Sequence, residues 1–366
     1  MADVQLPTAD RAPGGSGFAR LSRRVRTLIV AGVLFIVLFA LVFTLPVPYV
    51  VLSPGPTYNT IGTVASENGQ QQIISIKGAK VRKTTGNLNL TTVGVSTESI
   101  TPFEAFVGWL KHDEVVVPRS SVYPPGESQQ ETDRKNTQDF VVSQDNATAA
   151  AECELGYAPV AVNVYQLVPG GPSSRVLQAG EQIVSVAGKT TRSTTALRST
   201  LEAISPGTKV TLGVTRNGTP RSVAVTLGRS TDGKGGALGI VPNNVCKAPF
   251  TVDLALANQI GGPSAGLMFA LGIIDKVGPT DLTKGRFIAG TGTIDPFGRV
   301  GPIGGIQLKM IAARAKGATV FLAPSGNCED VKGNVPDGLK VVKVDTLHGA
   351  IEDLTKLENG QSVPGC

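Results

Sequence analysis

An uncharged apolar stretch near the N-terminus constrains this chain more than any other feature. It runs from Leu28 to Leu45 and reads LIVAGVLFIVLFALVFTL, eighteen residues without a charge. That length predicts a helix able to cross a bilayer, over residues 27–47. Five arginines and only two aspartates precede it, and the next charged residue is Glu67. Because basic residues stay on the cytoplasmic side, residues 1–26 are predicted to form a cytoplasmic disordered tail and the remainder to lie outside.

A cleaved signal peptide is the alternative interpretation of this stretch. The apolar run is longer than the core of a signal peptide, and the sequence Leu45-Pro46-Val47-Pro48 offers no pair of small residues for cleavage. We therefore favour an uncleaved anchor, which predicts a cell-membrane protein that crosses once. The net charge of +6 is explained by the N-terminal arginines, and we expect no nucleic-acid partner.

All four cysteines lie on the predicted outer side, at positions 153, 246, 328 and 366. An oxidising compartment permits disulfides, and four cysteines allow three connectivities. Among these we favour Cys153 with Cys246 and Cys328 with Cys366. There is no C-x-x-C pair and there are only two histidines, so no metal site is predicted.

Residues 48–158 are predicted to start as an extended proline-rich segment. Alternating, β-branched residues then predict strands at Gln72–Ile76 and Leu88–Val95. A helix is expected over Gln138–Leu155, ending at Gly156.

Residues 159–229 have the pattern of a small separate module. A strand at Val160–Leu167, a helix at Thr194–Ile204 and a hairpin turn at Asn217-Gly218 are expected. Together with the block LQAGEQIVSVAGK, this order resembles PDZ domains. The resemblance implies a groove between a strand and a helix where a peptide adds as an extra strand, with the carboxylate-binding loop expected near Gly156–Val160. A module without a ligand is the alternative.

The segment Gly228–Gly235 (GRSTDGKG) nearly spells a phosphate-binding loop. The hydroxyl residue that should follow the lysine and bind magnesium is replaced by glycine. We therefore interpret this segment as a linker, and expect no ATP and no other cofactor.

In the last predicted domain, residues 235–357, Ser264 lies between a tight loop and a helix. A strand at Val252–Ala257 leads into that loop, and Leu267, Leu271 and Ile274 have helical spacing. At a helix start, a serine hydroxyl lies beside free backbone N–H groups and the positive end of the helix dipole. The backbone of Gly262, Pro263 and Ala265 is therefore a candidate oxyanion site. A helix-capping serine is the alternative.

Lys309 is the second candidate. In a helix over Ile306–Lys316 it lies near the edge of the apolar stripe made by Ile306, Met310 and Ala313. A lysine in apolar surroundings loses hydration of its charged form, so its pKa falls. The neutral amine can then accept a serine proton. The alternative is a lysine whose end reaches water.

Two blocks, GGPSAGL and GPIGGIQLKMIAARAKGA, closely resemble the proteolytic domain of the Lon family of serine peptidases. The resemblance implies that Ser264 is the nucleophile, Lys309 the general base, and Thr291 a residue that orients the lysine. Two positions depart from the family pattern. Gly261 replaces an acidic residue, and Gln307-Leu308-Lys309 replaces a Lys-x-Lys motif.

The whole layout resembles the membrane-anchored PDZ-Lon proteins of Gram-positive bacteria. This implies an α+β fold with one transmembrane helix, a PDZ-like β-sandwich module and a Lon-type proteolytic domain. It also implies ATP-independent cleavage of unfolded or flexible protein segments captured by the PDZ groove, and it leaves a homo-oligomer open.

The sequence argues against three other functions. A non-catalytic PDZ scaffold is disfavoured because both Ser264 and Lys309 are present. A Ser-Lys signal peptidase would need a serine motif near residues 48–65, which is missing. A Ser-His-Asp triad is not expected, because neither His112 nor His348 lies in a nucleophile motif.

Overall fold

The computed structural model describes residues 22–66, 69–96, 99–216, 218–256 and 260–366. Most of the predicted tail, the Asn217 of the predicted hairpin turn and residues 257–259 of the predicted loop before Ser264 lie outside this range. The chain divides into two compact units. The N-terminal unit is Met1–Val51 with Ser96–Ser121, and the main unit is Leu52–Val95 with Val122–Cys366.

The N-terminal unit contains one long apolar helix. Helix α1 (Arg23–Thr44) is the one helix in the described residues that is long and apolar enough to cross a membrane. The unit also holds the start of β1 (Tyr49–Asn59), α2 (Pro102–Leu110), β6 (Val115–Pro118) and the 3-10 turn η2 (Arg119–Ser121). Residues typical of a helix N-terminus fix the start of α2. Thr101 and Glu104 form a capping box and Pro102 occupies the first turn.

The main unit is built on a mixed sheet with the strand order β20-β19-β16-β5-β1. Its further strands are β5 (Asn87–Val95), β16 (Phe287–Gly290), β19 (Val320–Pro324) and β20 (Lys340–Val344). Strands β5, β16, β19 and β20 run parallel, whereas β1 pairs antiparallel with β5. Every residue of β19 is buried, as expected for a parallel strand covered on both faces.

Helices cover this sheet, either in contact with its strands or packed on a helix that is. They are α3 (Gln129–Glu154), α5 (Gly266–Val277), α6 (Ile306–Ala315), α7 (Cys328–Val331) and α8 (Leu347–Glu358), with the 3-10 turn η3 (Ser325–Asn327) before α7. Phe140 of α3 and Phe269 of α5 meet edge to face, with ring centroids 5.7 Å apart. The helix predicted from Gln138 begins nine residues earlier, because Ser128 and Glu131 form a capping box there.

Short strand pairs complete the main unit. They are β2 (Thr63–Ser66) with β3 (Gly69–Gln72), β4 (Ile74–Lys77) with β15 (Thr251–Leu254), β12 (Gly228–Arg229) with β13 (Gly236–Ala237), and β17 (Thr293–Ile294) with β18 (Val300–Gly301).

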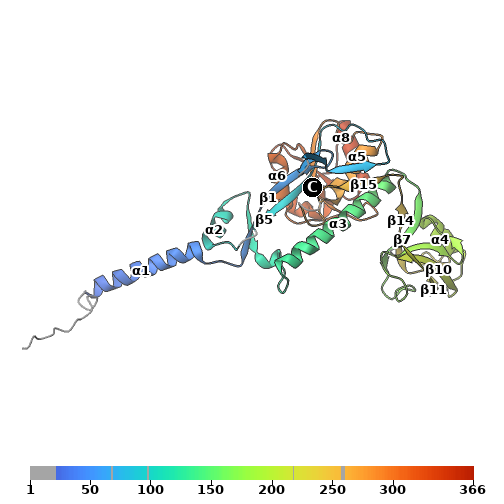
Figure 1. Cartoon of the computed structure of the whole chain (residues 1–366), viewed down its shortest axis with the longest axis horizontal. Helices are drawn as coiled ribbons and strands as arrows, with labels where there is room; N and C mark the ends of the chain where they lie inside the picture. Colours follow the sequence, from blue (N-terminus) through green and yellow to red (C-terminus); the bar gives the residue numbers. More distant parts are fainter. Residues whose placement is uncertain (1–21, 67–68, 97–98, 217, 257–259) are drawn as a thin grey trace, which may run out of the picture. The chain divides into compact units, whose positions relative to one another are not determined.

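Residues 159–246 form a separate sheet that we call the inserted module; the rest of the main unit is the mixed-sheet domain. In Figure 1 the strands and helix of the module form one green-to-yellow group. Its elements are β7 (Pro159–Leu167), β8 (Gln182–Val186), β9 (Lys189–Thr190), α4 (Thr194–Glu202), β10 (Lys209–Arg216), β11 (Thr219–Thr226) and β14 (Ile240–Cys246).

The sheet of the inserted module has the order β11-β10-β8-β7-β14. Strand β14 pairs along β7, so the module continues past residue 229, where the sequence suggested a boundary. The module has its own buried core, which includes Val162, Ile183 and Leu212. The carboxylate of Glu181 is fully buried and is held by the Arg221 guanidinium at 2.7 Å. Because a buried charge needs a partner, this pair fixes β11 against the turn before β8.

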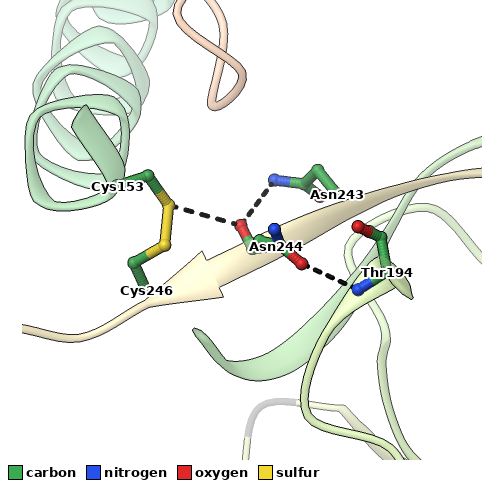
Figure 2. Close-up of a disulfide and its surroundings, with 5 residues drawn as sticks. All are labelled: Cys153, Thr194, Asn243, Asn244 and Cys246. Carbon is green, nitrogen blue, oxygen red and sulfur yellow. Dashed lines mark hydrogen bonds between the residues drawn. A yellow bond between two sulfur atoms is a disulfide. The ribbon is translucent and has the colours of Figure 1, made fainter. Parts of the chain in front are cut away.

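Two disulfides are present, and both are the pairs favoured from the sequence. Cys153 at the end of α3 bonds to Cys246 at the end of β14, as Figure 2 shows. Cys328 at the start of α7 bonds to Cys366.

Candidate active site

Ser264 lies two residues before the start of α5, which begins at Gly266. The residue at the cap position of α5 is Ala265, and no side chain makes a capping hydrogen bond there. The Ser264 hydroxyl instead lies 2.8 Å from the Lys309 amine. The helix-capping alternative is therefore wrong, and the serine is left with a basic partner.

Lys309 reaches Ser264 from the first turn of α6. Its side chain is almost fully buried, with 4% exposed, so the alternative of a lysine that reaches water is wrong. The Lys309 Nζ also lies 3.0 Å from Thr291 Oγ1, and no carboxylate pairs with it among the described residues. Burial without a countercharge lowers the pKa of Lys309 from its usual 10.5 to about 7.

Thr291 restricts how the lysine can be oriented. Its hydroxyl is fully buried and donates to the Ser264 carbonyl at 3.0 Å. A hydroxyl has one proton, so Thr291 Oγ1 must accept a hydrogen bond from the Lys309 amine. In a neutral amine this contact occupies one N–H, and the lone pair is free to face the Ser264 hydroxyl.

The backbone before Ser264 is held by α3, which the sequence did not indicate. The Gly262 N–H donates to the Asn136 carbonyl at 2.7 Å, and the Ser143 hydroxyl donates to the Pro263 carbonyl at 2.8 Å. These contacts join residues more than a hundred positions apart, so no local pattern reveals them.

The predicted oxyanion site is corrected by these contacts. The Gly262 N–H is already used, and Pro263 has no N–H to offer. Within the described part of the chain, the backbone N–H groups of Ser264 and Ala265 meet no acceptor. The donors available to an oxyanion are therefore these two groups at the start of α5, rather than the whole loop.

Gly261, where the sequence departs from the Lon pattern, has a structural explanation. A Cβ atom at this position would lie 3.0 Å from the Asn136 Cβ and close to the Asn136 backbone. Helix α3 therefore occupies the space that a side chain at position 261 would need. The second departure, Gln307, lies on α6 with its amide bonded to the Asp330 carbonyl, away from the Ser264–Lys309 pair.

A pocket of about 430 Å³ opens beside Ser264. Its walls include Pro56 of β1, Thr92 and Val93 of β5, Phe140 of α3 and Ile260. Lys309 is the one ionisable side chain among the residues that line it. The pocket can therefore accept an uncharged, extended peptide segment without burying an unpaired charge.

The inserted module carries a larger groove of about 1030 Å³ between α4 and the start of β14. Leu197, Leu201, Leu238 and Ile240 contribute apolar walls. Strand β14 is the last strand of its sheet, so one side of it is free to pair. The Asn244 side chain accepts a hydrogen bond from the Thr194 N–H at 2.8 Å and joins β14 to the start of α4 (Figure 2).

The predicted carboxylate-binding loop, Gly156–Val160, is absent from the lining of this groove. The segment Gly236–Ile240 lines it instead. The reason is chain order: the strand beside the groove, β14, comes after the other strands of the module and not before them.

The remaining candidates lie elsewhere. Neither His112 nor His348 lines the Ser264 pocket, and His348 is exposed with its Nδ1 2.7 Å from Glu154. The stretch resembling a phosphate loop forms the short β12–β13 hairpin. The described residues hold no group of three metal-ligating side chains.

Comparison with known proteins identifies two domains. Residues 257–356 match the Lon protease (S16) C-terminal proteolytic domain, and residues 132–227 match the PDZ domain. Both matches agree with the resemblances noted in the sequence.

Individual relatives match over short stretches. The periplasmic pH-dependent serine endoprotease DegQ of Escherichia coli (strain K12) is 42% identical over 80 residues, which are 22% of this chain and 18% of that protein. Lon protease 1 of Bacillus subtilis (strain 168) is 34% identical over 94 residues, 25% of this chain and 12% of that protein. The chain thus covers less than a fifth of either relative. The PDZ domain of the SdrC-like protein of Listeria monocytogenes is 20% identical, with a TM-score of 0.21, over 22% of this chain and 85% of that one.

Proposed function

We propose, from the premise that this chain joins a PDZ domain to a Lon-type proteolytic domain, that it is a membrane-anchored serine endopeptidase that works without ATP. Ser264 would be the nucleophile and Lys309 the general base. The observation that supports this most directly is the 2.8 Å contact between the Ser264 hydroxyl and a buried amine whose pKa is lowered to about 7.

Acylation follows from that contact. The neutral Lys309 amine takes the Ser264 proton as the oxygen attacks the carbonyl carbon of the substrate. The negative charge that develops on the carbonyl oxygen is stabilised by the N–H groups of Ser264 and Ala265 and by the positive end of the α5 dipole. Thr291 keeps the amine aimed at Ser264 through the hydrogen bond that it accepts.

Release of the products uses the same lysine twice. Protonated Lys309 gives its proton to the leaving amine, the C–N bond breaks, and an acyl ester on Ser264 remains. The neutral amine then takes a proton from water, and the resulting hydroxide attacks the ester. That proton returns to Ser264 Oγ as the acid product leaves, which restores the dyad.

The inserted module would supply the substrate. A peptide that pairs with the free edge of β14 would lie in the groove beside α4, with an apolar side chain between Leu197 and Leu201. This mode requires an extended, unpaired strand. The proposed substrates are therefore unfolded or flexible protein segments, and no separate unfolding motor is needed for them.

We also propose that α1 is retained as an anchor and that the main unit faces an oxidising compartment. The two disulfides support the compartment, and the arginines before α1 support the orientation. The competing function is a non-catalytic PDZ scaffold, which would not need a lysine buried against a serine.

The test is cleavage of casein by the purified full-length chain without ATP. Wild type, Ser264→Ala and Lys309→Ala are compared with Lys316→Ala, a matched control at an exposed lysine just after the same helix. We expect wild type and the control to cleave and both dyad variants to be inactive. Labelling with a fluorophosphonate should modify wild type and fail with Ser264→Ala. Equal cleavage by all four proteins would refute the dyad, and absence of both cleavage and labelling in wild type would favour the scaffold.

A further inference from the structure

Helix α2 presents four large apolar side chains to the outside of the N-terminal unit. The exposed fractions are 43% for Phe103, 55% for Phe106, 75% for Trp109 and 56% for Leu110. We call these four residues the α2 apolar face. Contiguous apolar groups of this size are uncommon on a soluble surface and indicate a contact with something apolar.

The four side chains share one side of the helix. At 100° per residue they span an arc of about 120°. The opposite side is the one that packs on the unit, because Gly108 is buried there and a Cβ on it would lie 3.1 Å from Val116 and 3.4 Å from Val51. The outward face is therefore not a core face left open by a loose helix.

The α2 apolar face is continuous with α1. The rings of Phe43, in the last turn of α1, and Phe103 have centroids 4.7 Å apart. Val47, just after α1, pairs with Ile100, just before α2. These contacts place the face at the end of α1, where a membrane-crossing helix would leave the hydrocarbon. Tryptophan is favoured at that depth because its ring is apolar while its N–H can reach the hydrated region. Phenylalanine and leucine are common on the apolar face of interfacial helices.

Polar residues limit how deep α2 could go. Glu104, in the first turn of α2, and Lys111, the residue after its last turn, are exposed and lie outside the apolar face. Lys111 forms an ion pair with Glu114 at 2.6 Å. With nine residues and a charge at each end, α2 is too short to cross a bilayer and would lie along its surface.

We propose that α2 is a membrane-interface helix, whose apolar face inserts among the lipids of the outer leaflet beside α1. The proposal rests on α1 being an anchor, but it does not depend on the peptidase activity. The occupant is lipid because the face continues the apolar surface of α1. The alternative occupant is a second protein or a second copy of this chain. Either would shield the face from water and also keep it away from acyl chains.

The chain carries its own probe, because Trp109 is its only tryptophan. The full-length protein is placed in phosphatidylcholine vesicles whose lipids are brominated either near the headgroup or near the acyl end. We expect Trp109 fluorescence to lose most of its intensity with the headgroup-side bromines, to lose less with the deep bromines, and to resist aqueous iodide.

Two variants keep the result interpretable. Trp109→Phe with Leu34→Trp places the probe in the middle of α1 and should be quenched most by the deep bromines. Trp109→Phe with Phe106→Trp moves the probe along the same face and should behave like wild type. If the Leu34→Trp probe is quenched while Trp109 is reached by iodide and not by bromine, the proposal is wrong although the anchor stands. Protection of Trp109 from both quenchers would also overturn it, in favour of a protein partner. If the Leu34→Trp probe is not quenched, the anchor itself fails.

Discussion

The proposed role of Lys309 as general base, together with its lowered pKa, predicts a defined pH dependence of peptidase activity. With a pKa of about 7, about half of the molecules carry a neutral amine at neutral pH. With the usual value of 10.5 only about one in three thousand would, so burial increases the population of competent base about a thousandfold. We therefore expect kcat/KM to rise with pH through a single ionisation centred near 7 and to level off above it.

The measurement is the rate of Ser264 labelling by a neutral fluorophosphonate, from about pH 5 to about pH 9. The probe does not ionise in this range, so the profile reports the enzyme, and casein cleavage provides the second profile. A rate that is flat across this range, or that still rises steeply at the alkaline end, would refute the assignment of Lys309 as a buried general base.

Burial of Lys309 favours the proposed activity but lowers the stability of the fold at neutral pH. As the pH falls from 10.5 to about 7, the unfolded chain takes up a proton at Lys309 that the folded chain does not. The free energy of unfolding therefore decreases over that window, by about 5 kcal/mol, and is constant below it. Lys309→Met removes this cost. It also takes a hydrogen-bond partner from the hydroxyls of Ser264 and Thr291, which destabilises the fold by about 1 to 3 kcal/mol. We expect the variant to be more stable than wild type by about 2 to 4 kcal/mol at neutral pH, measured by hydrogen exchange of the α5 and α6 amides. A less stable variant at neutral pH would contradict the argument.

Three further predictions concern other contacts. Thr291→Val should lower kcat about 10- to 100-fold with little change in KM, because the amine loses its orienting acceptor, and should move the acidic limb of the profile to lower pH. Thr291→Ser should retain most activity, and equal loss in both variants would contradict an orienting role. Cys153→Ser with Cys246→Ser should lower the free energy of unfolding by about 2 to 4 kcal/mol, seen as a lower melting temperature. Reductant, which also opens Cys328–Cys366, should lower the melting temperature of wild type at least as far. Glu181→Gln should destabilise the inserted module by about 2 kcal/mol. This is less than the cost of breaking a fully buried ion pair, because the Arg221 side chain is partly hydrated. Unchanged urea denaturation of the module would show that the ion pair contributes nothing.

The sequence predicted best those elements whose residue pattern lies within one continuous segment. The apolar run of α1 and the buried stripe of α5 follow from local patterns alone. The pairing of Ser264 with Lys309 did not follow from local patterns, because the same patterns also fit a helix-capping serine and a lysine whose end reaches water. The resemblance to the Lon proteolytic domain brought them together, and the structure places them within hydrogen-bond distance.

Other features depend on contacts between distant segments. Asn136 and Ser143 hold the loop before Ser264 from a helix more than a hundred residues earlier, and their polar character gave no sign of it. The boundary predicted at residue 229 leaves β14 outside the inserted module, because a glycine-rich stretch precedes this strand while its pairing partner β7 lies far back in the chain. The position of Lys309 beside the apolar stripe of α6 predicts that its side chain is partly buried, but the sequence does not show that only 4% is exposed.

The disulfide between Cys153 and Cys246 makes the inserted module a side branch of the chain. The Cα atoms of the two cysteines are 5.2 Å apart, a gap that a turn of a few residues can span. Residues 154–245, 92 in number (246 − 153 − 1), could therefore be replaced by a short glycine turn while the mixed sheet keeps its connectivity. Leu88 of β5 pairs with Ile288 of β16 across 200 residues (288 − 88). The bond shortens that path by nearly half, which lowers the loop-closure entropy by only about 0.6 kcal/mol. Its larger effect is on folding order: once it has formed, the parallel sheet can close whether or not the module has folded.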